Sequence, residues 1–254
     1  KSVVLGAVVN IALDPVFIFA CGMGVRGGAL ATVLSQMASA GYVLLFLFGK
    51  KVPVPITFGG YQWRIMKRVI LLGLSPFLII AFDNVLIIAM NASLQHFGGA
   101  EGDMLLTCNT IVQSFMLLIT MPLGGITGGT QTILGYNYGA GRPDRIRKAQ
   151  KHIIGLGMVF TAVMFVIAMT LSAQFAEIFT NDRFFIETSV RAIRISVLAI
   201  VPLAIQYEVV DGFTGMGAAA LAISQSMFRK AVYLAAMLIL PALAGIENVF
   251  YAEP

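Results

Sequence analysis

The stretch IIGLGMVFTAVMFVIAMTLSAQ, residues 153–174, contains no charged residue. A bilayer core of about 30 Å requires roughly 20 apolar residues in a helix. Six further stretches meet this requirement, and no stretch shows the period-two alternation of a barrel strand. The sequence therefore predicts an all-α integral membrane protein, a polytopic bundle with about seven transmembrane helices. The seven predicted spans cover residues 3–22, 28–48, 69–92, 104–134, 153–174, 188–212 and 219–243.

The composition excludes several classes of protein. Of the 254 residues, 58% are hydrophobic and 11% are charged, whereas about 25% of a soluble domain is charged. A water-soluble fold, a nucleic-acid-binding module and a secreted disulfide scaffold are therefore excluded. In a membrane protein, a net charge of +5 indicates cytoplasmic loops and contact with anionic lipid headgroups. We expect a multi-pass protein of the plasma (cell inner) membrane, with lipids and no nucleic acid as partners.

The basic residues fall mainly on one side of the predicted spans. The positive-inside rule places that side in the cytoplasm, so the first span runs from inside to outside. Only four basic residues, Arg26, Arg183, Arg191 and Arg194, are assigned to the other side. The thirteen assigned to the cytoplasm are Lys1, Lys50, Lys51, Arg64, Lys67, Arg68, Arg142, Arg145, Arg147, Lys148, Lys151, Arg229 and Lys230.

The connection formed by residues 49–68 carries the strongest linker signal, because it contains Pro53, Pro55, Gly59 and Gly60. We expect a cytoplasmic linker here. It would divide a two-helix part, residues 1–48, from a five-helix part, residues 69–254. The chain begins at Lys1 without a signal peptide and stops directly after a span. These features predict that residues are missing at both ends.

Acidic residues inside the spans need an explanation, because an acid at mid-bilayer costs about 2.5–3.5 kcal/mol. In the first span, the spacing of Asn10 and Asp14 places an amide and a carboxylate on one helix face. Pro15 lacks an N–H and leaves the carbonyl of Ile11 without its usual partner. Such oxygens suit Na⁺, and the carboxylate could instead hold a proton. The alternative is a structural hydrogen bond between helices.

Three other acids lie in later spans. Asp83 lies seven residues after Pro76, and Asp211 lies four residues after Tyr207, so each pair shares a helix face. Both pairs indicate residues that line a cavity. The alternative is that Glu208 and Asp211 lie near the cytoplasmic end and are wetted. The glycine run at residues 122–129, PLGGITGG, contains overlapping GxxxG patterns that predict close helix packing.

Signatures of catalysis and of metal binding are absent from the sequence. No HExxH, GxSxG or catalytic dyad occurs. His96 and His152 lie at opposite membrane faces without an acid or cysteine at ligand spacing, and Cys21 and Cys108 form no CxxC pair. We therefore expect neither an enzyme nor a zinc site, and no cofactor.

Five segments resemble, in order, parts of the multidrug and toxic compound extrusion (MATE) transporters. NIALDPVFIF (10–19) and GMGVRGGALATVLSQ (22–36) resemble the family's fifth and sixth helices. GLSPFLIIAFDN (73–84) resembles its seventh helix, GYNYGAGRPDRIRKA (135–149) the stretch after its eighth, and GFTGMG (212–217) the end of its tenth. The resemblance spans the whole chain.

This resemblance implies twelve helices in two bundles of six, facing a cavity that opens alternately to either side. The chain would supply the fifth to eleventh helices, with residues 1–48 ending the N-terminal bundle and residues 69–254 forming most of the C-terminal bundle. The cation site of the first bundle would use three residues of this chain. The family's site also has an acid on the family's first helix, which is not part of this chain. By resemblance, that site comprises Asn10, Asp14 and Thr32, and the second-bundle coupling residues are Asp83, Tyr207 and Asp211.

The resemblance also implies a function. We expect a secondary active antiporter that exports cationic or amphipathic organic compounds in exchange for Na⁺ or H⁺. Two alternatives stay open: a lipid-linked oligosaccharide flippase of the same superfamily, and a non-transporting helical scaffold or channel. Acids outnumber bases in the spans, which favours the exporter over the flippase. The sequence decides neither the coupling ion nor the oligomeric state.

Overall fold

The computed structural model of the protein describes residues 2–49 and 59–253. Within this part every regular element is a helix. The chain divides into two compact units, residues 1–62 and residues 63–254. Most of the predicted linker, including Pro53 and Pro55, lies outside the described residues.

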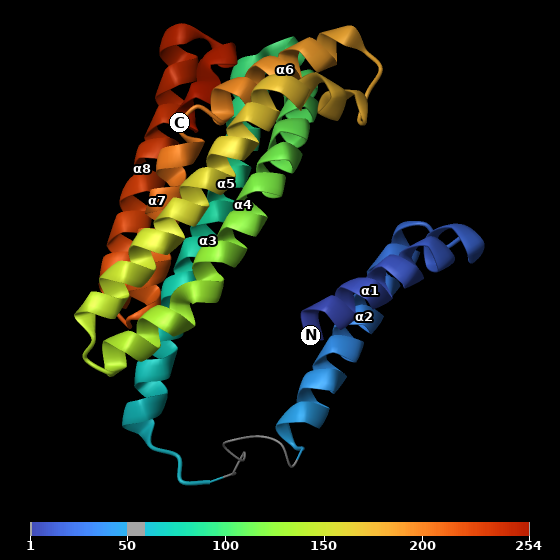
Figure 1. The fold of residues 1–254 in the computed structure, drawn as a ribbon. Coiled ribbons are helices and arrows are strands. Elements are labelled where there is room, and N and C mark those ends of the chain that lie inside the picture. The colour runs from blue at the N-terminus through green and yellow to red at the C-terminus, as the bar shows by residue number, and fades with distance from the viewer. Residues whose placement is uncertain (1, 50–58, 254) are drawn as a thin grey trace. The chain divides into compact units, whose positions relative to one another are not determined.

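The first unit is a pair of packed helices (Figure 1). Helix α1 (Ser2–Pro15) does not stop at its proline but continues as a π-helical turn, η1 (Val16–Ala20). Helix α2 (Val25–Leu47) follows after a short connection. The connection contains Gly22 and Gly24 with φ angles of +64° and +54°, in the left-handed region that favours glycine.

The second unit is a helical bundle (Figure 1). Helix α4 packs against α5 and α7, and α3 packs against α8. Its elements are α3 (Trp63–Gly98), η2 (Gly99–Glu101), α4 (Gly102–Gly139), α5 (Pro143–Glu177), α6 (Arg183–Ser196), α7 (Ile200–Gly215), α8 (Ala219–Ala244) and η3 (Ile246–Ala252). Helix α3 begins at Trp63, earlier than the predicted start at residue 69.

The long apolar helices confirm the prediction of about seven spans. Among the described residues, six helices are long and apolar enough to cross a membrane, and a bent pair raises the number to seven. That pair is α6 and α7, which meet at an angle of 52°. The predicted continuous span at 188–212 is therefore broken. Pro202 lies just after the break, where its ring would clash with the carbonyl of Leu198 in a continuous helix.

Helix α4 is also longer than a bilayer requires. It contains 38 residues, which at about 1.5 Å per residue exceeds the bilayer core of about 30 Å. A helix of this length tilts or extends past the bilayer core.

The apolar side chains of the second unit divide between a core and an exposed surface. In the core, Phe115 of α4 contacts Phe175 of α5 edge to face, with ring centroids 5.1 Å apart. On the surface, large apolar side chains are widely exposed, and Leu243 of α8 is 81% exposed. An apolar surface of this extent matches a lipid environment rather than water.

Candidate functional site

In the first unit, the predicted residue Asp14 approaches α2 at Gly28. A Cβ atom placed on Gly28 would lie 4.0 Å from Oδ1 of Asp14. The hydroxyl of Thr32, one turn further along α2, donates to the carbonyl oxygen of Gly28 at 2.9 Å. Gly28 is therefore the point of α2 that the Asp14 carboxylate approaches and to which Thr32 is hydrogen-bonded.

Asn10 lies one turn before Asp14 on α1. Its Nδ2 atom is buried and finds no hydrogen-bond partner among the described residues. Directly after Asp14, the chain changes from α-helix to the π-helical turn that begins at Val16. Turns of this kind are frequent at functional sites. The first unit thus places an amide, a carboxylate and an irregular backbone segment in one region of α1.

The second unit contains a cavity of about 380 Å³ between α3, α4, α7 and α8. The three residues that the sequence singled out in this unit, Asp83, Tyr207 and Asp211, all line it. Pro76 lines it as well, as the shared helix face with Asp83 predicts. The structure therefore brings residues of four separate sequence segments around one space.

Asp211 is held by two side chains of α4. The hydroxyl of Thr127 donates to its Oδ2 atom at 2.5 Å, and the Nε2 atom of Gln131 donates to its Oδ1 atom at 2.9 Å. Thr127 and Gln131 lie one helical turn apart, so both reach the same carboxylate. Asp211 therefore lines the cavity with both of its oxygens already engaged.

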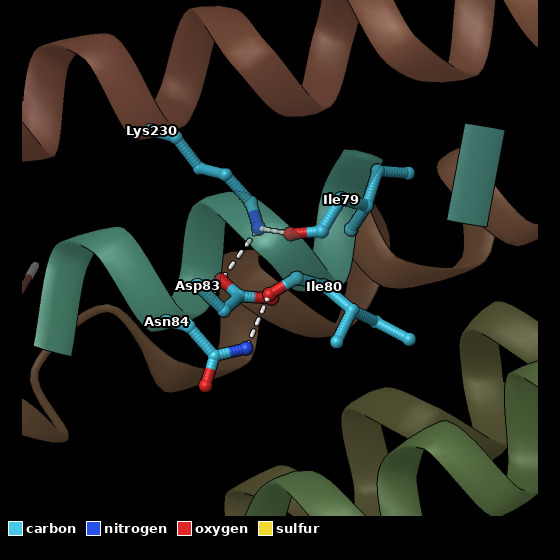
Figure 2. Close-up of polar contacts among 5 residues, drawn as sticks. All are labelled: Ile79, Ile80, Asp83, Asn84 and Lys230. Atoms are coloured by element: carbon cyan, nitrogen blue, oxygen red, sulfur yellow. Dashed lines mark hydrogen bonds and ion pairs between the residues drawn. The ribbon is translucent and has the colours of Figure 1, made fainter. Parts of the chain in front are cut away.

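Asp83 is paired with a lysine from the other side of the cavity. The Nζ atom of Lys230 on α8 lies 2.5 Å from Oδ1 of Asp83 and also donates to the carbonyl oxygen of Ile79 at 2.5 Å. Figure 2 shows the ammonium pointing between these two oxygens of α3. On the neighbouring turn, the amide of Asn84 donates to the carbonyl oxygen of Ile80.

This pairing corrects the sequence analysis, which assigned Arg229 and Lys230 to the cytoplasmic side. Both residues lie within helix α8 (Ala219–Ala244) and line the cavity. The signal was present in the sequence, because both fall inside the predicted span at 219–243. A basic residue within a span requires a counter-charge or an aqueous cavity, and Asp83 in the third span supplies the counter-charge.

The glycine run on α4 provides another correction. A Cβ atom on Gly124, Gly125 or Gly129 would meet nothing within 4 Å, and one on Gly128 would meet only Oδ2 of Asp211, at 4.0 Å. These glycines therefore do not mediate the predicted close packing. Gly124 and Gly128 line the cavity instead, because the missing side chains leave room beside the carboxylate.

Close packing occurs further along the same helix. A Cβ atom on Gly135 would lie 2.6 Å from the carbonyl oxygen of Gly215, so α4 and α7 touch backbone to backbone at this point. The first unit has an equivalent contact, where a Cβ atom on Gly27 would lie 2.7 Å from the carbonyl oxygen of Phe17.

Glu208 is not wetted, contrary to the alternative that the sequence left open. Its side chain is 1% exposed, and neither carboxylate oxygen has a hydrogen-bond partner among the described residues. It also does not line the cavity. A buried carboxylate without a hydrogen-bond partner is costly.

Outside the spans, Glu253 follows the last helical turn and lines a neighbouring cavity. Burial raises the pKa of its carboxyl above the ordinary value. Among the residues that the structure describes, no group of three or more His, Cys, Asp or Glu could hold a metal ion. Cys21 and Cys108 are free thiols.

Comparison with known proteins identifies the family. The family model described as MatE matches residues 80–240. The chain is 25% identical to the multidrug export protein MepA of Staphylococcus aureus (strain N315) over 251 residues, which cover 96% of the chain and 53% of MepA. It is also 25% identical to human multidrug and toxin extrusion protein 1 over 179 residues, covering 69% of the chain and 30% of that protein.

Solved structures show the same fold. An outward-facing multidrug resistance MATE transporter superposes with a TM-score of 0.90 at 23% identity, covering 99% of the chain and 57% of that structure. A MOP superfamily transporter from Pyrococcus furiosus gives a TM-score of 0.91 at 23% identity, with the same coverage of 99% and 57%. The chain spans about half the length of the curated relatives it matches. Because the family model matches more than half of the chain, this multi-pass protein of the plasma membrane belongs to the MATE family, whose members are transporters and not enzymes.

Proposed function

We propose that this protein is a secondary active antiporter that exports cationic or amphipathic organic compounds in exchange for Na⁺ or H⁺. The observation that carries this proposal is the cavity of about 380 Å³ within the membrane bundle, lined by Asp83 and Asp211. Carboxylates in a pocket that also has apolar walls, formed by residues such as Ile79, Ile80 and Val210, suit an organic cation, because the pocket provides both charge and apolar contact. Two of the relatives are named for multidrug export and for multidrug and toxin extrusion.

We further propose that the coupling ion binds in the first unit, at Asn10, Asp14 and Thr32. The approach of the Asp14 carboxylate to Gly28 and the hydrogen bond from Thr32 to the Gly28 carbonyl support this site. Cation binding at Asp14 would favour one geometry of the helix at Pro15 and its π-helical turn. Antiport requires that ion and substrate disfavour each other's bound state, which is a coupling free energy between the two sites.

We also propose that residues 1–48 end an N-terminal bundle and that residues 69–254 form most of a C-terminal one. The division of the chain after residue 62 supports such an arrangement. Asp83, Tyr207 and Asp211 would then form the substrate or coupling region of the second bundle.

A specific observation keeps the flippase as a second candidate. A lipid-linked oligosaccharide carries a pyrophosphate, which requires basic groups in the cavity, and Arg229 and Lys230 both line it. Lys230 is already neutralised by Asp83, which leaves Arg229 as the remaining cation. The exporter therefore ranks first. A scaffold or channel would show no dependence on an ion gradient.

The test uses the complete protein in proteoliposomes and follows a fluorescent organic cation under an imposed Na⁺ gradient and, separately, an imposed pH gradient. The variants are Asp14→Asn and, as a control, Asp144→Asn, which alters an exposed acid at the start of α5. We expect one gradient to drive uptake in the wild type and the control but not in Asp14→Asn. Wild-type transport by Asp14→Asn would reject the coupling site. Movement under neither gradient would reject antiport and direct the test to lipid-linked oligosaccharides.

A further inference from the structure

The pairing of Lys230 with Asp83 resembles an occupied cation site. The ammonium of Lys230 lies 2.5 Å from a carboxylate oxygen and 2.5 Å from the carbonyl oxygen of Ile79. These are the oxygen types that an external cation would use in the same place. The lysine side chain reaches them from α8, across the interface with α3 (Figure 2).

The two partners differ in their exposure. The side chain of Lys230 is 2% exposed, whereas the side chain of Asp83 is 50% exposed. Asp83 also lines the cavity, so a cation in the cavity can approach the open side of the carboxylate while the lysine holds the other side. The carboxylate carries one negative charge, however, and the lysine already neutralises it. Arg229, next to Lys230, lines the same cavity and adds positive charge.

We propose that Lys230 is a tethered competitor for cations at Asp83. A cation that takes the carboxylate must displace the ammonium, and the displaced lysine is left buried with only the Ile79 carbonyl. The inference rests on the proposed function in one respect, since it takes the cavity as the place where organic cations bind. It assigns to Lys230 the role of setting which cations can bind there.

The competition selects between classes of cation. Breaking the ion pair is unfavourable, because a buried charge without its partner is strongly disfavoured. A small inorganic ion offsets the cost of breaking the ion pair only through its charge. An amphipathic organic cation also gains apolar contact with Ile79, Ile80 and Val210 of the lining. Lys230 therefore restricts Asp83 to cations that are both charged and apolar.

The decisive experiment measures the binding of tetraphenylphosphonium, a permanently charged organic cation, to the complete purified protein by equilibrium dialysis. The test variant is Lys230→Met, and the matched control is Lys151→Met, which removes an exposed lysine of α5. If Asp83 is free in about one tenth of the wild-type molecules, removal of the competitor raises the affinity about tenfold. We expect this gain in Lys230→Met and no change in the control.

Two further variants keep the result interpretable. Lys230→Gln also removes the charge but retains a donor for the Ile79 carbonyl, so the same gain is expected if the methionine variant does not fold. In the double variant Asp83→Asn and Lys230→Met the gain must disappear, because the carboxylate is absent. An affinity of the folded Lys230 variants equal to or below the wild type would overturn the proposal, and so would a gain that persists in the double variant. Failure of the proposed function is recognised separately, as transport that neither gradient drives.

Discussion

The acids of the two units are in different states. In the second unit, Asp83 is paired with Lys230 of α8, and Asp211 accepts hydrogen bonds from two side chains of α4. In the first unit, no ion pair or hydrogen bond joins the Asp14 carboxylate to another described residue. The Nδ2 atom of Asn10 also finds no partner in the described part of the chain.

The difference goes with the helices that surround each acid within the described residues. Helix α1 packs against α2 within its unit, whereas α3 and α7 each have several helices around them. Asp83 and Asp211 are therefore paired with side chains of adjacent helices, whereas the carboxylate of Glu208 has no partner among the described residues. The comparison is consistent with the proposed cation site at Asp14 and shows that Asp83 and Asp211 are engaged by neighbouring side chains.

The largest expected effect comes from breaking the ion pair of the second unit. Asp83→Asn leaves Lys230 buried without its counter-charge, and we expect a loss of about 3–5 kcal/mol in the free energy of unfolding. Adding Lys230→Met should restore most of this loss, because both charges are then absent. In the first unit, Asp14→Asn should change stability by no more than about 0.5 kcal/mol.

Unfolding of the complete protein in detergent measures these differences, with the exposed Asp144→Asn as the control. Equal destabilisation by Asp83→Asn and Asp14→Asn would contradict the contrast between the units. So would a double variant that is no more stable than Asp83→Asn alone.

A smaller effect is expected from the partners of Asp211. Thr127→Val preserves the shape of the side chain but removes the hydroxyl that donates at 2.5 Å, and a hydrogen bond to a charged group contributes about 1.5–3 kcal/mol. We expect unfolding measurements to show a loss in this range in the free energy of unfolding. The matched control, Thr170→Val, alters an exposed threonine that bonds only to its own helix and should have little effect. Equal losses in both variants would show that the Asp211 contact adds no stability.

The smallest contrast concerns close backbone contacts at glycine, of which each unit has its own. Gly135→Ala and Gly27→Ala each place a Cβ atom within 2.7 Å of a backbone atom of another segment, and overpacking of this kind costs about 1–3 kcal/mol. Gly155→Ala is the control, because its Cβ would meet nothing within 4 Å; it should stabilise α5 by about 0.5–1 kcal/mol. Tolerance of Gly27→Ala alone would mean that the first unit is packed less firmly than the second.

Much of the fold and part of the candidate site could be predicted from local sequence. The spans follow from apolar runs of sufficient length, because in a bilayer each helix satisfies its own backbone and needs no partner to form. The helical repeat also predicted that Pro76 and Asp83 share a face, as do Tyr207 and Asp211. The cavity lining contains all four residues.

The glycine run and the break in the sixth span show where local patterns were insufficient. The GxxxG pattern at residues 122–129 predicts close packing, but among the described residues no backbone comes close to these glycines, and Gly124 and Gly128 border a cavity. The break between α6 and α7 depends on the angle at which the two segments pack, 52°. Hydropathy does not encode that angle.

The sequence by itself determined that this chain is a membrane-spanning helical protein and which helix faces carry acids, because span length and helical periodicity are properties of neighbouring residues. Only the tertiary structure decided the partners of those acids. The contact between Lys230 and Ile79 joins residues 151 positions apart, and it depends on the depth and rotation of α8 against α3. Those two quantities are set by packing between helices, and they determine that Asp83 carries its own cation.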